Sequence, residues 1–271
     1  MNIEKKTIQT IKNYKLFDKK DRIAVALSGG KDSTSVLYIL HKLGYNVSGL
    51  MIDLHLGEWS RKNLENMKKF CNQLGVELHV VDLRKELGSG ICFIKQAVKQ
   101  KKNLTGCSVC GVIKKYILNK WAKKLKAGKI ATGHNLDDEC QTILMNFLKG
   151  NLMLGVNSGP AAGIMKGFVQ RVKPLFFIPE NEIRKYSKKM KFPVLYEKCP
   201  CAFGTYRVET RNWLESLNLS EKEKLKIVRA WMKKSEALKK KFDKKLFICE
   251  NCGEVSSSNV CSFCRIMECI G

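Results

Sequence analysis

A chain of 271 residues in which 44% are hydrophobic can bury a full core, so a wholly disordered protein is excluded. The formal charge of +25, from 50 basic and 25 acidic residues, favours a polyanionic partner, with nucleic acid ahead of a membrane surface. No run approaches the ~18 consecutive apolar residues of a membrane span, and the charged segment 1–20 lacks the apolar core of a signal peptide, so we expect a cytoplasmic protein without a membrane partner.

The predicted elements alternate, in chain order, between short apolar strands and amphipathic helices. Helices are expected at residues 3–17, from a glycine turn to about 43, at 60–74 and at 221–245. Strands are expected at residues 22–27, 46–53, 76–82, 129–132 and 169–172. The alternation predicts an α/β fold, with a doubly wound parallel sheet and helices on both faces. Ligands of such sheets bind beyond the carboxyl ends of the strands.

A glycine turn follows the first predicted strand and opens the next helix. Its sequence is SGGKDS, and its residues are Ser28, Gly29, Gly30, Lys31, Asp32 and Ser33. Glycines at a helix N-terminus let backbone N–H groups close on an anion, so we predict a phosphate site. The turn is not a Walker A loop, because Val25 and Asp32 occupy the positions that this loop gives to a glycine and to Ser or Thr.

Two other predicted strands end in polar residues that can meet this turn in space. Asp53 closes the strand over 46–53, and the sequence TGHNLDDE, residues 132–139, comes at the end of the strand over 129–132. Asn135 is a plausible N-cap, and the acids after it suit the helix dipole. A helix cap explains these acids but not the Thr-Gly-His that precedes them.

Twelve cysteines in a cytosolic protein indicate metal binding or catalysis rather than disulfides. Cys107 and Cys110 open a predicted helix, and helical spacing puts Lys114 on the face of Cys110, away from the apolar stripe. A C-x-x-C pair can be a redox disulfide or half of a zinc or iron–sulfur site, and the pair alone leaves these open. Cys199 or Cys201, which flank a proline, would make a third thiolate, and a 4Fe–4S cluster on three thiolates keeps one iron free for an exogenous sulfur.

The C-terminal region carries a second group of cysteines and a basic stretch before it. Two C-x-x-C knuckles separated by eight residues, a strong signal for structural Zn²⁺, are formed by Cys249, Cys252, Cys261 and Cys264. So short a tail cannot otherwise bury enough surface to fold. The stretch 221–245 has ten lysines and one arginine against four acids. We expect it to contact the phosphates of a nucleic acid rather than to be only a solvated face.

These motifs resemble those of known enzymes. The turn SGGKDS is similar to the PP-loop of ATP pyrophosphatases, which split ATP between the α- and β-phosphates. The run CSVCGVIKKYILNKWAKKLKAGKIATGHNLDDECQTILMNFL closely resembles the TtuA/NcsA family of tRNA 2-thiouridine synthetases, and the resemblance extends over about residues 21–264. It implies ATP and Mg²⁺ at the turn, with Gly133 against the nucleotide and with Asp32 and Asp138 serving the metal.

The resemblance also implies roles for the cysteines. It implies that a 4Fe–4S cluster is held by Cys107, Cys110 and Cys199, while Lys114 offsets charge at the reacting oxygen. We expect an N-terminal helix, a PP-loop domain, a basic helical tail and a zinc ribbon, at residues 1–20, 21–205, 206–245 and 246–271. Family members usually open with another Cys/His zinc module, whereas the first cysteine of this sequence is Cys71.

The reaction implied by the resemblance is sulfuration of a uridine base in tRNA. ATP would adenylate the C2 oxygen of a flipped or unpaired base, pyrophosphate would leave, and a sulfur on the open iron would displace AMP. The sulfur donor would be sulfide or a thiocarboxylated small protein, and a homodimer is expected.

Three alternatives to this reaction share some of these sequence features. A tRNA 2-thiocytidine synthetase shares the PP-loop and the three cysteines, but the ribbon and the GHNLDDE context favour uridine. A persulfide relay through Cys107 or Cys110, without iron, stays open. A zinc-dependent RNA-binding module with a vestigial nucleotide fold is disfavoured by the intact SGGKDS.

Overall fold

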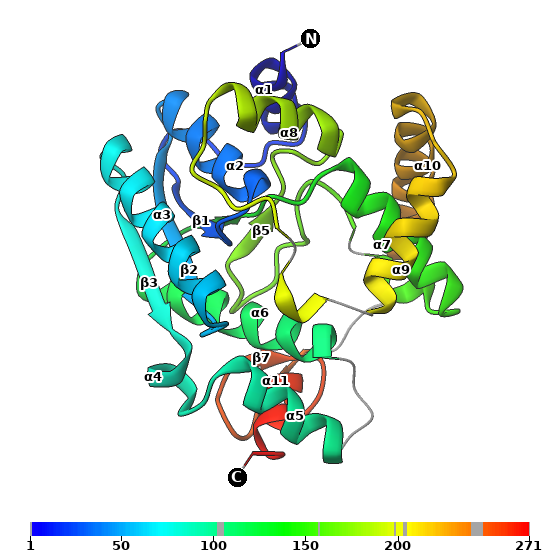
Figure 1. The fold of residues 1–271 in the computed structure, drawn as a ribbon. Coiled ribbons are helices and arrows are strands. Elements are labelled where there is room, and N and C mark those ends of the chain that lie inside the picture. Colours follow the sequence, from blue (N-terminus) through cyan, green and yellow to red (C-terminus); the bar gives the residue numbers. More distant parts are fainter. Residues whose placement is uncertain are drawn as a thin grey trace.

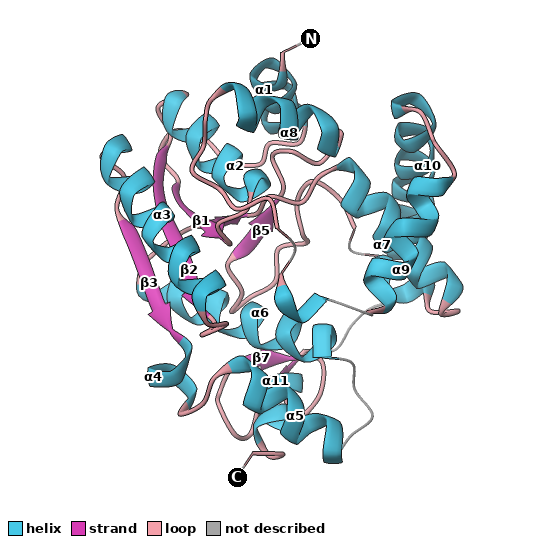
Figure 2. Cartoon of the chain, viewed as in Figure 1, coloured by secondary structure: helices cyan, strands magenta, loops and turns pink. Residues whose placement is uncertain are grey.

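The first strand of the chain, β1 (Arg22–Leu27), lies at the centre of a five-stranded parallel sheet in the computed structural model (Figures 1 and 2). β2 (Asn46–Asp53) and β3 (Leu78–Asp82) follow on one side of β1. β4 (Lys129–Ala131) and β5 (Gln170–Val172) lie on the other side. The order β3-β2-β1-β4-β5 confirms the doubly wound α/β fold and puts the topological switch point between β1 and β4.

The structure describes most of the chain. The described residues are 2–101, 106–156, 158–197, 199–202, 205–239 and 246–270, without the side chains of Cys107, Leu154 and Ala202.

Helices cover both faces of the sheet because its central strand is apolar on both sides. One face is covered by α1 (Ile3–Asn13), α2 (Lys31–Lys42), α3 (Glu58–Leu74) and α8 (Glu180–Lys189), whose core includes Ile23, Val25 and Leu27 of β1. The opposite face, which includes Ala24, packs against α5 (Ile91–Lys101) and α6 (Gly106–Lys124). A strand buried on both faces is what a parallel sheet requires.

A third group of helices packs beside the sheet, at the right of Figure 1. It consists of α7 (Leu136–Leu148), α9 (Tyr206–Ser216) and α10 (Glu221–Lys239), with a small core of its own. Val228 is the buried residue of α10 in this core, as expected for a docked apolar side. Residues 240–245 of the predicted basic helix lie outside the described residues.

Short elements complete the chain. They are α4 (Leu83–Leu87), the 3-10 helices η1 (Leu152–Gly155) and η2 (Pro200–Ala202), the hairpin β6 (Phe247–Ile248) and β7 (Val255–Ser256), and α11 (Ser262–Met267). In the described ranges, no helix has the length and apolar character needed to cross a membrane.

The sequence predicts the bounds of β1 and β2, but β3 begins two residues later than expected. Gly75 ends α3 in the left-handed region with φ of 66°, and the N–H of Val76 still donates to the Cys71 carbonyl. Val76 therefore belongs to the helix cap and to the core, and pairing with β2 starts at Leu78.

Candidate nucleotide, cluster and zinc sites

The glycine turn after β1 closes tightly against α3. Gly29 has a φ of +75°, and a Cβ at this position would lie 2.3 Å from Asn63 Oδ1, so glycine is required there. Gly30 caps α2, and the N–H of Ser28 donates to Ser33 Oγ at 3.2 Å. The turn thereby presents the N-terminus of α2, where the first N–H groups have no intrahelical acceptor, as an anion site.

Gly133 packs against the same turn from the neighbouring strand end. A Cβ at Gly133 would lie 2.6 Å from the Ser33 nitrogen and 2.8 Å from the Asp32 carbonyl carbon. The side chain of Asn135 donates to Asp32 Oδ1 at 3.2 Å. The two strand ends that flank the switch point therefore meet at backbone distance, and any side chain at Gly133 would push them apart.

Two carboxylates lie in this region, on α2 and on α7. Asp32 is recessed, with 26% of its side chain exposed, and its pKa is raised by burial and further by the Asp138 carboxylate, while Lys31 at 2.9 Å opposes the shift. Asp138 forms a capping box with Asn135: its Oδ2 accepts the Asn135 N–H at 3.3 Å, and Asn135 Oδ1 accepts the Asp138 N–H at 3.1 Å. A divalent cation would relieve the mutual repulsion of the two acids, so this pair suits Mg²⁺.

One buried amide beside the glycine turn is unsatisfied. Asn63 is 1% exposed, and neither its Nδ2 nor its Oδ1 has a hydrogen-bond partner within the described part of the chain. Buried polar groups are normally bonded, so a polar ligand seated on the turn is the partner this site favours. The cradle around Gly29 and Gly133 and this amide together fit a nucleotide phosphate.

Cationic side chains surround the glycine turn. Lys31 Nζ lies 2.7 Å from Glu180 Oε1 of α8, and Arg211 of α9 pairs with the same carboxylate. Arg207 of α9 lies 3.6 Å from Asp138 Oδ1. These ion pairs join α8 to the N-terminus of α2, and α9 to α8 and to the N-terminal turn of α7.

Two of the four histidines lie at strand ends. Burial lowers the pKa of His134, and Thr132 Oγ1 lies 2.9 Å from its Nδ1, so the imidazole is neutral near pH 7. Asp53 ends β2, and its Oδ1 accepts the backbone N–H of His55 at 2.9 Å. The His55 ring lies 2.7 Å from Asp82 Oδ1, at the end of β3. Asp53 therefore lies at the same edge of the sheet as the glycine turn, but its carboxylate bonds within a local turn.

The second half of the site lies where α5, α6 and η2 meet. α6 carries Cys110 and, one turn further, Lys114. In its apolar stripe Val109, Ile113 and Ile117 are fully buried, and Tyr116 is partly buried. η2 packs against α6 and brings Cys199 close enough for Lys114 and Lys95 to lower its pKa, although burial of the thiol has the larger, opposite effect. The side chain of Cys107 lies outside the described residues.

The donor set at this corner fits an iron–sulfur cluster. Partly buried thiols beside two ammonium groups favour a bound group with net negative charge, such as a thiolate-ligated cluster. A further thiol is present that the sequence analysis did not single out: Cys92 of α5 is exposed, and its Sγ lies 3.8 Å from Cys201 Sγ.

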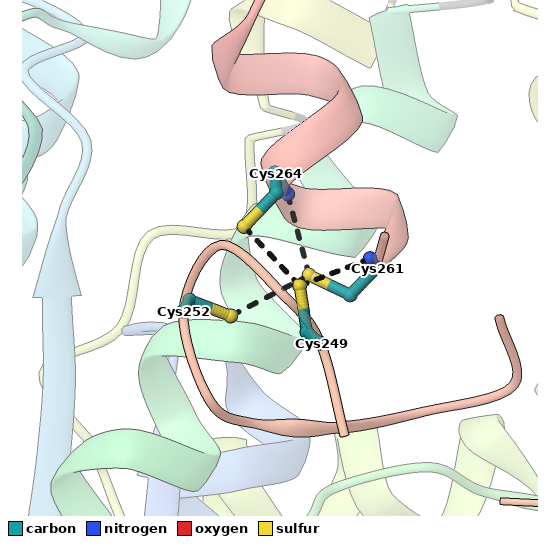
Figure 3. Close-up of side chains that lie close together, drawn as sticks. All are labelled: Cys249, Cys252, Cys261 and Cys264. Atoms are coloured by element: carbon teal, nitrogen blue, oxygen red, sulfur yellow. Dashed lines mark hydrogen bonds between the residues drawn. The ribbon is translucent and has the colours of Figure 1, made fainter. Parts of the chain in front are cut away.

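The four C-terminal cysteines come together as their spacing predicts (Figure 3). A metal-binding group, with ligand atoms all within 4.8 Å of one another, is formed by Cys249, Cys252, Cys261 and Cys264. The N–H of Cys261 donates to Cys249 Sγ at 3.3 Å, and such backbone donors lower the pKa of Cys249 to about 6. Four thiols in a closed group, on a hairpin and a short helix, fit a structural zinc ion.

The zinc module is not an independent appendage, because it packs on α6. Phe263 of α11 stacks on Tyr116, with ring centroids 3.6 Å apart and planes within 3°. Asn119 and Lys123 of α6 bond to Glu254 at 3.1 and 2.7 Å. The helix that carries Cys110 and Lys114 is therefore supported from its other side by the ribbon.

Sequence reasoning missed the neighbours that tertiary packing supplies to the site. Asn63 is one polar residue on a polar helix, and Glu180 is 149 residues away from its partner Lys31. Cys92 offers the one signal that could have been used, since it is a cysteine at the start of an amphipathic helix in a chain rich in paired cysteines.

Known relatives match nearly the whole chain. The family model of a PP-loop domain matches residues 1–196. A tRNA-5-methyluridine(54) 2-sulfurtransferase of Pyrococcus horikoshii is 37% identical over 266 residues, which cover 97% of this chain and 83% of the relative. A protein of the same name from Thermus thermophilus is 33% identical over 271 residues, covering 98% and 82%.

Solved structures point to the same group. The U34-tRNA thiolase NcsA from Methanococcus maripaludis, with its [4Fe-4S] cluster, has a TM-score of 0.79 to this structure at 27% identity. The match covers 99% of this chain and 88% of the thiolase. With the PP-loop turn, the cysteines near α6 and the C-terminal cysteine group in place, the chain belongs to the PP-loop ATP pyrophosphatases and, within them, to the TtuA/NcsA family.

Proposed function

We propose that the protein is a tRNA uridine 2-sulfurtransferase that adenylates the C2 oxygen of uridine with ATP and replaces it with sulfur, in the cytoplasm. The observation that carries the proposal is the meeting of two strand ends at the switch point, where a Cβ at Gly133 would lie 2.6 Å from the Ser33 nitrogen. The names of the relatives indicate tRNA as the substrate class, and the cysteines beside α6 are groups that could bind the sulfur to be transferred.

The nucleotide half of the site is assigned to the glycine turn. The turn residues Ser28, Gly29, Gly30, Lys31 and Ser33 would cradle the phosphates of ATP, and Asn63 would donate to one of them. Asp32 and Asp138 would hold Mg²⁺, which neutralises charge on the leaving pyrophosphate. Lys31 is held by Glu180 in this structure and can exchange that carboxylate for a phosphate oxygen. Asp53 would line the same edge of the sheet.

The sulfur half of the site is assigned to α6 and η2. We assign Cys107, Cys110 and Cys199 to a 4Fe–4S cluster, which when bound would supply an iron without a protein ligand for an exogenous sulfur. Cys199 is preferred to Cys201 because Cys201 Sγ is already paired with Cys92 Sγ, whereas Cys199 is under the influence of Lys114. Lys114, one turn after Cys110 on α6, would stabilise negative charge on the reacting oxygen.

The other parts of the chain would serve the tRNA and the fold. α10 presents exposed cations along its length, which we assign to tRNA phosphates: Lys222, Lys226, Arg229, Lys233, Lys234 and Lys239. Zn²⁺ bound by the four ribbon cysteines would stabilise the ribbon, which packs on α6. The sulfur donor would be sulfide or a thiocarboxylated small protein, and the assembly a homodimer.

The experiment that tests the proposal is ATP cleavage in the presence of tRNA. Purified, cluster-loaded protein should release pyrophosphate and AMP faster when tRNA is added, and Asp32→Asn should abolish this release. The variant should melt no lower than the parent, because the amide removes the cost of burying a carboxylate whose pKa is raised.

A control variant tests whether the loss of pyrophosphate release is specific to Asp32. Glu58→Gln removes a carboxylate that is 69% exposed on α3, and it should leave pyrophosphate release unchanged. Parental rates in Asp32→Asn, or ATP cleavage indifferent to tRNA, would contradict the proposal.

A further inference from the structure

Two thiols near the proposed cluster ligands, where α5, α6 and η2 meet, have no role in the proposed reaction. Cys92, the second residue of α5, is exposed, and its Sγ lies 3.8 Å from Cys201 Sγ of η2. A disulfide needs about 2.05 Å between the sulfurs, so a side-chain rotation of a pair this close can form the bond without moving the helices. The two cysteines are 109 residues apart in sequence, and the packing of η2 against α6 brings them together.

The surroundings connect this pair to the sulfur half of the site. Burial and the neighbouring thiols of Cys201 and Cys199 raise the pKa of Cys92, and Lys95 opposes this shift. Lys95, one turn after Cys92 on α5, acts on both Cys92 and Cys199. The stem of Lys95 also lies beside Gly106, since a Cβ at Gly106 would be 3.4 Å from Lys95 Cδ. An anion released at the pair would therefore meet the ammonium group of Lys95, and Lys114 acts on the adjacent Cys199.

We infer that Cys92 and Cys201 form a redox dithiol that takes the outer sulfur of a persulfide and releases it as hydrosulfide beside the cluster site. The inference rests on the proposed function, because it supplies that reaction with its sulfur. Cys92 receives the sulfur because it is the exposed member of the pair, and Cys201 resolves the product because it is the thiol within reach.

The two steps balance in atoms and electrons. The Cys92 thiolate attacks the outer sulfur of a donor R–S–SH; the donor S–S bond breaks, R–SH leaves, and a persulfide forms on Cys92. The Cys201 thiolate then attacks Cys92 Sγ, a Cys92–Cys201 disulfide forms, and hydrosulfide leaves with the electron pair of the broken bond. The two cysteine sulfurs are oxidised while the transferred sulfur is reduced, and a dithiol reductant returns the pair to its starting state.

The test uses the full-length, cluster-loaded protein with glutathione persulfide, in the absence of oxygen, ATP and tRNA. The parent should release about one hydrosulfide per chain without a dithiol, and peptide mapping should find the Cys92–Cys201 disulfide. Cys201→Ser should retain the extra sulfur on Cys92, and Cys92→Ser should slow hydrosulfide release by about tenfold or more, because the accepting thiol is lost. Cys71→Ala is the matched control, since that thiol is 1% exposed and should not react.

Failure of this inference and failure of the proposed function give different results. Cys92→Ser should lower thiolation of tRNA when glutathione persulfide is the donor but not when hydrosulfide is supplied. Parental hydrosulfide release in Cys92→Ser, or no disulfide in the parent, overturns the dithiol. Normal disulfide formation in a protein that thiolates no tRNA with either donor would instead overturn the proposed function alone.

Discussion

At the scale of single residues, the closest contacts of the site are those that glycine alone permits. Gly29 meets Asn63 and Gly133 meets the Asp32–Ser33 backbone, and each would clash if it carried a Cβ. The carboxylates of Asp32 and Asp138 lie where these backbones converge, and burial raises the pKa of Asp32. The nearby Asp138 carboxylate adds to that shift, and carboxylates placed together in this way are typical of a site that binds a divalent cation with its phosphate ligand.

The third cluster ligand is a prediction at this scale. Anaerobic reconstitution with iron and sulfide should give a 4Fe–4S absorption spectrum in Cys201→Ala, because Cys201 contacts Cys92 and is not one of the assigned ligands. Cys199→Ala should give a labile cluster or none, since only two thiolates would remain. The reverse pattern would reassign the ligand to Cys201, and full thiolation by iron-free protein would remove the cluster from the mechanism.

At the scale of elements, α6 links the two proposed metal sites, which lie on opposite sides of the helix. One side of the helix carries the partly buried Cys110 and Lys114, and the other side carries Tyr116 and Asn119, which contact the ribbon. The ribbon cysteines belong to the same apolar core as α5 and α6. Loss of the ribbon should therefore disturb the cluster corner through the helix, without direct contact.

Phe263→Ala tests this mechanical link. Removing a ring that is 8% exposed and stacked on Tyr116 should lower stability by about 3 kcal/mol and make the cluster more labile to a chelator, while bound zinc stays near its parental level. Chemical denaturation, metal analysis and the cluster spectrum measure the three effects. Ile248→Ala, at a ribbon residue that is 64% exposed, is the control and should change none of them.

A cluster as stable in Phe263→Ala as in the parent, despite the lost stacking, would show that the ribbon does not support the sulfur half of the site.

The exposed cations of α10 give a second prediction at this scale. Replacing Lys226, Lys233 and Lys234 with glutamine should flatten the dependence of tRNA affinity on salt, lowering the slope of log K against log salt by about 2 to 3, since each phosphate contact releases counterions. The apolar side of α10 stays docked through Val228, so the fold should be unaffected.

The matched control for α10 is a triple substitution on α3, on the opposite side of the molecule in Figure 1. Lys62, Lys68 and Lys69 are equally exposed there, and their replacement by glutamine should leave the slope as it is. Equal slopes for all three proteins would make α10 a solvated face that tRNA does not touch.

At the scale of the whole molecule, the sheet could be predicted from sequence because its signals are local. Apolar runs bounded by turns fix β1 and β2, and Asn135 starts α7 by the capping box that its neighbours allow. The apolar pattern places the start of β3 too early, because Val76 belongs to the cap of the preceding helix and a strand pattern does not reveal this.

The site was predictable only in part, for the same physical reason. Residues of a motif, such as those of SGGKDS, are adjacent in sequence and share one turn. The partners that complete the site come from other elements, as Cys92 does for Cys201 across 109 residues, and only packing decides which of them meet. The support of α6 by the ribbon was likewise unforeseen, because cysteine spacing predicts a metal but not the surface on which the module packs.

The proposed function requires that this chain place sulfur on a uridine of tRNA. This requirement is tested by nucleoside mass spectrometry of tRNA from cells lacking the gene, with the lost position mapped along the tRNA. A 2-thiouridine nucleoside should disappear on deletion and return with the parental gene but not with Asp32→Asn. Unchanged levels of every 2-thiolated uridine in the deletion strain, or full restoration by Asp32→Asn, would contradict the proposed function.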